Sequence, residues 1–298
     1  MSAHFERVAV IGVGLIGGSF ALALKAAGAC GSIIGVGRHP ANLARARDLG
    51  VIDASDPDPA QAVRGADLVL LATPVAQTAQ ILGALAASLG PRTLVTDAGS
   101  TKRDVVAAAR RALGARAAQF IPGHPIAGGE HSGVSAAKAD LFRGKRIVLT
   151  PLDENAPADV ASVEAAWTAC GAVVSRMTPE VHDAVFATVS HLPHLLAFAL
   201  VHEIAGRDNA AQLFDYAGSG FRDFTRIASS HPEMWRDIVL ANRDALLAEC
   251  TRYQRTLDAL CSLLEHGDGE QLERLFTEVR CARDAWLGQT GPGAGASR

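Results

Sequence analysis

Two histidine-bearing stretches carry side chains suited to acid–base chemistry. His124 stands between a glycine and a proline, so it is not a core residue in the middle of a helix. Residues 190–194 add His191 and His194 at the start of a stretch with helical periodicity. An unperturbed imidazole has a pKa of about 6.5, so a neutral histidine can accept a proton near pH 7. These stretches predict a histidine general base.

Charged residues occur beside glycines in two further stretches. Residues 218–226 read Gly-Ser-Gly-Phe-Arg-Asp-Phe-Thr-Arg and supply Arg222 and Arg226, whose side chains can grip a carboxylate through two parallel hydrogen bonds. Residues 97–102 read Asp-Ala-Gly-Ser-Thr-Lys and follow an apolar run, at the edge where open α/β sheets bind ligands, although Ser100 can also be a simple helix cap. The histidines lack a recognisable metal-ligand set. We therefore predict a cleft between domains for a small-molecule substrate, with a histidine base, arginine clamps and no metal.

A glycine-rich turn in the first thirty residues is typical of a dinucleotide-binding site. Residues 7–11 form an apolar run, residues 12–19 read Gly-Val-Gly-Leu-Ile-Gly-Gly-Ser, and helical periodicity follows. In such a strand–turn–helix unit Gly12 permits a tight turn, Gly14 lets the backbone approach a pyrophosphate, and Gly17 lets the helix pack on the strand. The N–H groups at the start of the helix then bind phosphates. The predicted cofactor contacts are Gly12, Gly14, Leu15, Ile16, Gly17, Arg38, Thr73 and Pro74.

The residues after the second apolar run bear on the choice of coenzyme. NAD-binding folds usually place Asp or Glu there, where the carboxylate bonds the ribose 2′-hydroxyl. Residues 36–39 read Val-Gly-Arg-His and contain no carboxylate. Arg38 can pair with a 2′-phosphate, which favours NADP, or it can stack on the adenine, in which case NAD still binds. The sequence therefore predicts NADP or NAD, with NADP slightly favoured.

Length and composition point to a soluble globular chain with two domains. The chain has 298 residues, of which 49% are apolar, and a formal net charge of −3. That charge and the lack of a basic tract argue against nucleic acid or an anionic membrane as the main partner. The five cysteines are scattered, which indicates reduced thiols. The apolar runs fall short of the roughly 20 residues of a bilayer span, and the first strand leaves no room for a signal peptide, so we expect a cytoplasmic protein without a membrane segment.

Short apolar runs alternate with helical stretches up to residue 178. Predicted strands cover residues 7–11, 32–36, 67–74, 93–97, 120–122, 146–150 and 172–175, and predicted helices cover residues 40–49, 102–113 and 161–170. This alternation predicts an α/β fold with a Rossmann-type doubly wound sheet over residues 1–178.

From residue 179 onward, long helical periodicities replace the strand pattern. One apolar stripe runs along residues 246–264 and another along residues 272–286. Because a small helical unit can hardly bury both stripes alone, residues 179–287 are predicted to form an all-helical substrate and dimerisation domain of a homodimer. Residues 288–298 are rich in glycine and lack an apolar period, which predicts a disordered tail.

Five of these segments together resemble the prephenate/arogenate dehydrogenase family of tyrosine biosynthesis. They are residues 12–19, 97–102, 123–128, 190–194 and 219–226, in order along the chain. The resemblance implies an N-terminal Rossmann domain and a C-terminal helical dimerisation domain. It also implies oxidative decarboxylation of prephenate or arogenate to 4-hydroxyphenylpyruvate or tyrosine. The residues leave the choice of substrate open, because the two compounds differ only in a keto or an amino group.

The same resemblance implies roles for individual positions. His124 matches the catalytic histidine that hydrogen-bonds the ring C4 hydroxyl, and Ser100 matches a serine that assists there. Arg226 matches the arginine that binds a substrate carboxylate, and Arg222, one helical turn earlier, is either a second substrate contact or a surface charge. The other positions matched around the substrate are Glu130, His194, Asp223 and Trp235.

Two other functions stay open. The β-hydroxyacid dehydrogenases also join a Rossmann domain to helices, but they normally need a lysine base on the first long helix, and residues 180–205 contain no lysine. The non-enzyme alternative is a nucleotide-sensing regulator that kept the fold and lost turnover. The combination of His124, Ser100 and the arginines argues against that regulator.

Overall fold

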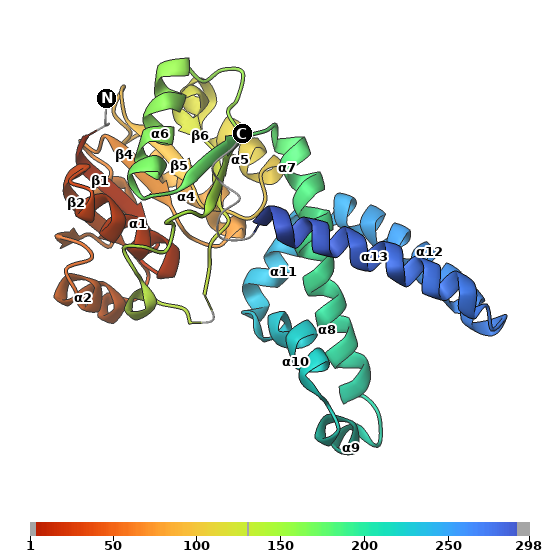
Figure 1. Cartoon of the computed structure of the whole chain (residues 1–298). Helices are drawn as coiled ribbons and strands as arrows, with labels where there is room; N and C mark the ends of the chain where they lie inside the picture. The colour runs from red at the N-terminus through yellow and green to blue at the C-terminus, as the bar shows by residue number, and fades with distance from the viewer. Residues whose placement is uncertain (1–3, 130, 291–298) are drawn as a thin grey trace. The chain divides into compact units, whose positions relative to one another are not determined.

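The computed structural model describes residues 4–129 and 131–290. The chain divides into two compact units, one ending at Leu246 and the other beginning at Leu247. The first unit contains both sheets of the described chain and the helices up to α11, and the second contains most of α12 and all of α13 (Figure 1).

The larger sheet has six parallel strands in the order β3-β2-β1-β4-β5-β6. Its strands are β1 (Phe5–Ile11), β2 (Cys30–Val36), β3 (Ala54–Ser55), β4 (Leu68–Leu71), β5 (Leu94–Asp97) and β6 (Phe120–Ile121). The order changes direction between β1 and β4, which creates the switch point where open α/β sheets bind nucleotides. This topology confirms the predicted Rossmann-type sheet.

Helices cover both faces of this sheet. They are α1 (Leu15–Ala26), α2 (Pro40–Asp48), α3 (Pro59–Ala62), α4 (Thr78–Leu85), α5 (Arg103–Leu113) and α6 (Pro157–Ala169). Successive side chains of a strand point to opposite faces, so neighbouring residues of β1 enter different cores. Val10 packs in one core with Phe20 of α1 and Trp167 of α6, whose ring centroids are 4.7 Å apart. Ile11 packs in the other core with residues of α4 and α5.

Three strands form a second, smaller sheet. They are β7 (Gly123–Pro125), β8 (Arg146–Leu149) and β9 (Val173–Arg176), with β7 antiparallel and β9 parallel to β8. The prediction that residues 146–150 and 172–175 continue the main sheet is therefore wrong. The pairing of β8 with β7 draws these strands away, and β7 is too short to be seen in the apolar pattern. Strand β7 of this small sheet carries His124, the predicted general base.

Helices make up the rest of the first unit. They are α7 (Pro179–Phe186), a π-helical turn (Ala187–His191), α8 (Leu192–Ala205), α9 (Ala210–Asp215), α10 (Ser219–Thr225) and α11 (Pro232–Ala241). The π-helical turn ends two residues before Pro193, which has no N–H for the regular helical ladder. Thr178 caps α7 by accepting the backbone N–H of Val181 at 3.2 Å. The predicted boundary at residue 178 falls between β9 and α7 and stays a prediction.

The helix from Pro179 to Ala205 is an exception to the expectation that the apolar segments are too short for a bilayer span. Its 27 residues are long and apolar enough to cross a bilayer by length and composition alone, and 28% of its most apolar window is buried. One such helix is weak evidence for a membrane span, because helices of soluble proteins pass the same test. Three buried polar side chains, His182, Asp183 and His191, lie on it. The cytoplasmic location stays a prediction.

The second unit is helical. Helix α12 (Arg243–Glu265) begins in the first unit, and α13 (Gly269–Thr290) follows a turn in which Gly267 has a φ of +65°. The large apolar side chains of this unit include exposed ones on both helices, such as Leu257, Leu264 and Phe276. Helix α13 continues through residues 288–290, so these three residues of the expected tail are helical. Residues 291–298 lie outside the described residues.

Candidate active site

The glycine turn after β1 has the geometry that a dinucleotide requires. A Cβ on Gly12, whose φ is +99°, would meet the carbonyl oxygen of Ala72 at 2.5 Å, whereas a Cβ on Gly14 would meet nothing within 4 Å. Gly14 is the N-cap of α1 and provides no side-chain cap, so the first N–H groups of the helix, beginning at Leu15 and Ile16, face no competing acceptor from that residue. Thr73 adds a buried hydroxyl without a hydrogen-bond partner among the described residues. Together these features fit a bound pyrophosphate.

Other predicted cofactor residues surround this turn. Gly17 is buried against the turn, where an added Cβ would strike the carbonyl oxygen of Gly12. Pro74 directly follows Thr73 at the carboxyl end of β4. Arg38 is exposed in the loop between β2 and α2. Asn42 of α2, which the sequence did not single out, donates to the carbonyl oxygen of Val13 at 2.8 Å and so holds the glycine turn.

Asp97 connects the two segments that carry Ser100 and His124. It ends β5, is buried, and accepts the backbone N–H groups of Gly99 at 2.8 Å and Gly123 at 3.0 Å. The ammonium of Lys102, which is 0% exposed, donates to the same carboxylate at 2.5 Å. The loop of Ser100 is thereby fixed to the strand of His124. Charged residues at both ends of the 97–102 segment were the available signal, but their mutual contact could not be predicted.

The ring of His124 lies against helix α7. Its Nδ1 is 2.8 Å from Nε2 of His182, and its centroid is 4.8 Å from that of Phe186. Burial, and then the neighbouring His182 and Lys102, hold the pKa of His124 well below its usual range. His124 is therefore neutral near pH 7, the state that a general base needs.

Asp183 lies behind His182. Its Oδ1 is 2.8 Å from Nδ1 of His182, and its two oxygens accept the backbone N–H groups of Lys102 at 2.8 Å and Arg103 at 2.9 Å. Burial alone would raise the pKa of Asp183, but the hydrogen bonds from His182 and from these backbone groups lower it overall. Burial also lowers the pKa of His182. The sequence did not identify either residue, because a polar pair near a helix start is ordinary.

A second group of polar side chains lies further along the same helix. His194 stacks on Trp235, with ring centroids 3.6 Å apart and an angle of 19°, and its Nδ1 donates to the carbonyl oxygen of Ser190 at 2.9 Å. Burial lowers the pKa of His194, and the nearby Arg226 acts in the same direction. The structure thus brings three predicted residues, His194, Trp235 and Arg226, close together.

Asn242 and His191 link this group to Asp183. The amide nitrogen of Asn242 donates to the carbonyl oxygen of Asp183 at 2.7 Å and lies 3.2 Å from Nδ1 of His191. The ring of His191 lies edge-on to Trp235 at 6.1 Å. Hydrogen-bonded side chains therefore run from His124 to His191, and ring contacts through Trp235 continue to His194.

Three predicted site residues lie outside the contacts described above. Arg222 and Asp223 are exposed on α10, directly before the short helix that starts at Arg226. Glu130 lies outside the described residues. The roles assigned to all these residues stay predictions.

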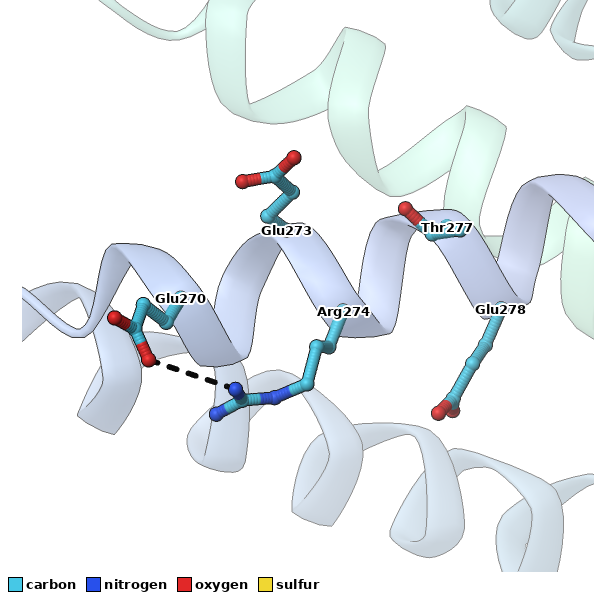
Figure 2. Close-up of a pocket in the computed structure, with 5 residues that line it drawn as sticks. All are labelled: Glu270, Glu273, Arg274, Thr277 and Glu278. Atoms are coloured by element: carbon cyan, nitrogen blue, oxygen red, sulfur yellow. Dashed lines mark ion pairs between the residues drawn. The ribbon is translucent and has the colours of Figure 1, made fainter.

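A separate pocket lies on α13 in the second unit (Figure 2). It is lined by Glu270, Glu273, Arg274, Thr277 and Glu278, and Arg274 forms an ion pair with Glu270 at 3.6 Å. Four of these five residues are charged, and none is a histidine or cysteine. Within residues 4–129 and 131–290, no cluster of three or more His, Cys, Asp or Glu side chains could hold a metal ion.

Comparison with known proteins matches both parts of the chain. Residues 20–176 match the family model described as the prephenate dehydrogenase nucleotide-binding domain, and residues 178–278 match the prephenate dehydrogenase dimerization domain. The chain is 40% identical over 281 residues to a prephenate dehydrogenase of Bacillus subtilis, which covers 94% of this chain and 76% of the relative.

Solved structures give the same result. A prephenate dehydrogenase from Aquifex aeolicus, in complex with hydroxyphenyl propionate and NAD+, matches with a TM-score of 0.90 and 37% identity over 96% of this chain and 99% of that one. A Synechocystis arogenate dehydrogenase matches with a TM-score of 0.80 and 30% identity over 94% of this chain and 99% of that one. The chain belongs to the prephenate dehydrogenase family of dinucleotide-dependent oxidoreductases.

Proposed function

We propose that this chain oxidises and decarboxylates prephenate or arogenate with NAD(P)+ as hydride acceptor. The observation that carries the proposal is the placement of His124, whose pKa is lowered by burial. His124 is fixed beside the nucleotide-binding sheet through Asp97 and beside the helical residues through His182, in a chain of this family. Such a position lets one imidazole serve a substrate that lies between the coenzyme and the helices.

The substrate ring is a cyclohexadiene with a hydroxyl on C4 and a carboxylate on the quaternary carbon across the ring. The glycine turn with Gly12 and Gly14 would hold the coenzyme, whose nicotinamide would supply the acceptor for the hydride of C4. His124 takes the hydroxyl proton, and Ser100 assists at the same oxygen. The bond to the ring carboxylate then breaks, CO2 leaves, and its electron pair completes the aromatic ring while His124 returns the proton to the C4 oxygen to give the phenol. Aromatisation makes the reaction effectively irreversible.

Arg226 is the proposed partner of a substrate carboxylate. A carboxylate removed from water needs a cation or several donors, and the guanidinium supplies both. His194 and Trp235 lie beside it and provide a polar ring nitrogen and a flat apolar wall. We assign Glu130, Asp223 and Arg222 to the periphery of the same site, on the sequence match alone.

For the coenzyme, we propose that Arg38 allows NADP as well as NAD and favours NADP slightly. The guanidinium of Arg38 is exposed just after β2. Residues 36–39 contain no carboxylate that would repel a 2′-phosphate there. NAD+ is bound in the Aquifex relative.

We also propose that the enzyme is a homodimer assembled through its helical part. The matched C-terminal model is described as a dimerization domain. Val181, Val185 and Val189 are exposed at spacings of four residues, so they form one apolar stripe along the helix. Analytical ultracentrifugation should give the mass of two chains, and a monomer at micromolar concentration would contradict this assembly.

The enzymatic proposal is tested by absorbance at 340 nm with prephenate or arogenate and NAD+ or NADP+, in all four combinations. We expect reduction of coenzyme with at least one pair, accompanied by release of CO2. Reduction with a simple β-hydroxyacid instead would support the other dehydrogenase class, although the helix from Pro179 to Ala205 contains no lysine base. No reduction in any combination, by folded protein that binds coenzyme, would overturn the proposal.

A further inference from the structure

We infer that Asp183 and His182 are positioning residues that fix the tautomer of His124, so that Nδ1 carries the proton and Nε2 is the proton-accepting atom. The inference rests on the proposed function for its chemical meaning and on the hydrogen-bond chain for its geometry. Neither residue touches the substrate in this scheme, and both act through the ring of His124.

The hydrogen-bond chain begins at the carboxylate of Asp183, which can only accept hydrogen bonds. Both oxygens of Asp183 accept backbone N–H groups at the start of helix α5, at 2.8 Å from Lys102 and 2.9 Å from Arg103. Backbone nitrogens can only donate, and the N-terminus of a helix favours negative charge. Helix α5 has no side-chain cap from its own N-cap residue, Lys102, so Asp183 supplies that cap from α7.

The direction of each further hydrogen bond follows from this anchor. Because Oδ1 of Asp183 is an acceptor, Nδ1 of His182 at 2.8 Å carries a proton and donates it. A neutral imidazole has one N–H, so Nε2 of His182 is a bare acceptor. The atom facing it at 2.8 Å, Nδ1 of His124, must then be the donor. The remaining nitrogen of His124, Nε2, is left with a free lone pair.

This arrangement serves a general base in two ways. Free imidazole side chains favour the opposite tautomer, with the proton on Nε2, so the chain holds His124 in the form that can accept a proton there. When His124 becomes an imidazolium, its Nδ1–H still donates to His182, and the Asp183 carboxylate behind it stabilises the positive charge. A carboxylate behind the histidine of serine proteases acts similarly, without the intervening ring.

Neighbouring residues hold the hydrogen-bonded side chains of Asp183, His182 and His124 in place. Thr178 caps α7 just before His182 and Asp183, and Asn242 holds the backbone carbonyl of Asp183 at 2.7 Å. His182 and Asp183 are both 0% exposed, so water does not compete for their hydrogen bonds. Phe186, one turn later, packs on both rings at 4.8 Å and 4.5 Å.

Nitrogen NMR of protein labelled with 15N-histidine tests the inference directly. In the wild-type enzyme near pH 7.5, we expect His124 to show a protonated Nδ1 and a bare Nε2. In Asp183→Asn, an amide nitrogen at the Oδ1 position would donate to Nδ1 of His182 and would give up the hydrogen bond from the backbone N–H of Lys102. This orientation reverses both hydrogen bonds of the histidine pair and places the proton of His124 on Nε2. We expect kcat to fall by roughly 10²–10⁴-fold, as for the loss of a correctly protonated base, with the KM for coenzyme unchanged. A bare Nδ1 on wild-type His124 would overturn the inference, and so would an unchanged kcat in an Asp183→Asn variant whose His124 carries its proton on Nε2.

A pair of substitutions at His182 covers the case in which Asp183→Asn fails to fold. In His182→Gln the amide can donate to Asp183 and accept from Nδ1 of His124, so the tautomer and most of kcat should be kept. In His182→Leu the acceptor is lost, so kcat should fall at least tenfold below that of His182→Gln. Equal kcat values for the two variants would mean that His182 acts by packing alone, which contradicts the inference.

Asp53→Asn is the matched control. Asp53 also accepts a backbone N–H, from Ile33 at 2.7 Å, and a basic side chain, Lys25, at 2.7 Å, but it has no contact with the histidines. Its substitution should leave kcat and the His124 signals unchanged. The two proposals fail separately: an active wild-type enzyme with the other tautomer overturns only this inference, whereas an inactive enzyme with the expected tautomer overturns only the proposed function.

Discussion

Two buried carboxylates, Asp97 and Asp183, flank His124 and are satisfied in different ways. Asp97 ends a strand of the nucleotide-binding sheet and is paired with the ammonium of Lys102 at 2.5 Å. Asp183 lies on helix α7, where it accepts N–H groups from the backbone and from the neutral ring of His182. Lys102 joins the two sites, because its side chain binds one carboxylate and its backbone binds the other.

Because their partners differ, Asp97 and Asp183 have different roles. A carboxylate neutralised by a buried cation contributes little field beyond the pair, so Asp97 serves mainly to hold the backbone of Gly123 and thereby the strand of His124. Arg103 reaches Asp183 at 3.3 Å, but its side chain is 40% exposed, so water screens much of its charge. Asp183 therefore keeps more of its negative charge and can act on the base through His182. One carboxylate fixes where His124 is, and the other fixes which proton it carries.

The largest expected effect falls on the residue that both carboxylates serve. In His124→Ala we expect kcat to drop by roughly 10²–10⁴-fold, the usual scale for a lost general base. The KM for coenzyme should change little, because the glycine turn lies on a different segment. Steady-state kinetics at saturating coenzyme measure both quantities. A variant with near-wild-type turnover would remove His124, and with it the comparison, from the mechanism.

The substitutions Lys102→Met and Arg103→Met test the difference between the two carboxylates through the free energy of unfolding. Lys102→Met leaves the Asp97 carboxylate buried without its cation, and breaking such a pair costs about 3–5 kcal/mol of unfolding free energy. Arg103→Met, by contrast, removes a half-exposed contact and should cost no more than about 1 kcal/mol. Urea unfolding of both variants makes the measurement. Adding Asp97→Asn to Lys102→Met should recover part of the loss, and equal losses in the two single variants would contradict the comparison.

Acid should act first around helix α7 and the π-helical turn after it, which carry His182 and His191 and pack against the ring of His124 on β7. Burial lowers the pKa of His124 and His182, and it lowers the pKa of His191 to about 4. The unfolded chain, with ordinary histidines near 6.5, binds more protons below that pH, so stability should be complete above pH 6.5 and fall as pH drops toward 4.

Two measurements follow this acid response. The melting temperature should decrease from pH 7 to pH 5, and hydrogen exchange should rise in α7 and α8 before β5. The value of kcat/KM should stay level down to a pH below 6.5, because a base with a lowered pKa remains neutral there. An acid limb of kcat/KM centred above pH 6.5 would argue that His124 is not buried in this way.

Sequence alone could predict the parts of the molecule whose signals are local. The glycine turn and the apolar runs specify the sheet, and His124 stands out because it lies between a glycine and a proline. The partner of His124 could not be predicted, since His182 lies 58 positions away in the sequence. The hydrogen bond from Lys102 to Asp183 likewise joins residues 81 positions apart. Residues 182 and 183 look like an ordinary polar helix start, and β7 is too short for a strand pattern.

A smaller effect is expected on the helical side at Arg226. In Arg226→Lys the charge is kept but the two-pronged grip on a carboxylate is lost. We expect the KM for prephenate or arogenate to rise roughly tenfold or more, while kcat and melting temperature move little, because the arginine binds ground state and transition state alike. If the variant instead loses stability and keeps its KM, Arg226 has a structural role, and the helical side contributes orientation of the base without substrate binding.

The smallest effect is expected at the far end of the coenzyme, where neither carboxylate acts. Arg38→Ala should raise the KM for NADP about three- to tenfold and that for NAD less, since a surface guanidinium paired with a 2′-phosphate is worth on the order of 1 kcal/mol. Arg47→Ala, which removes an exposed arginine from the last turn of α2, controls for general charge. Titration of each coenzyme at fixed substrate gives the ratio. Equal losses for both coenzymes would show that Arg38 stacks on the adenine, and coenzyme choice would then rest on the backbone of the β2–α2 loop.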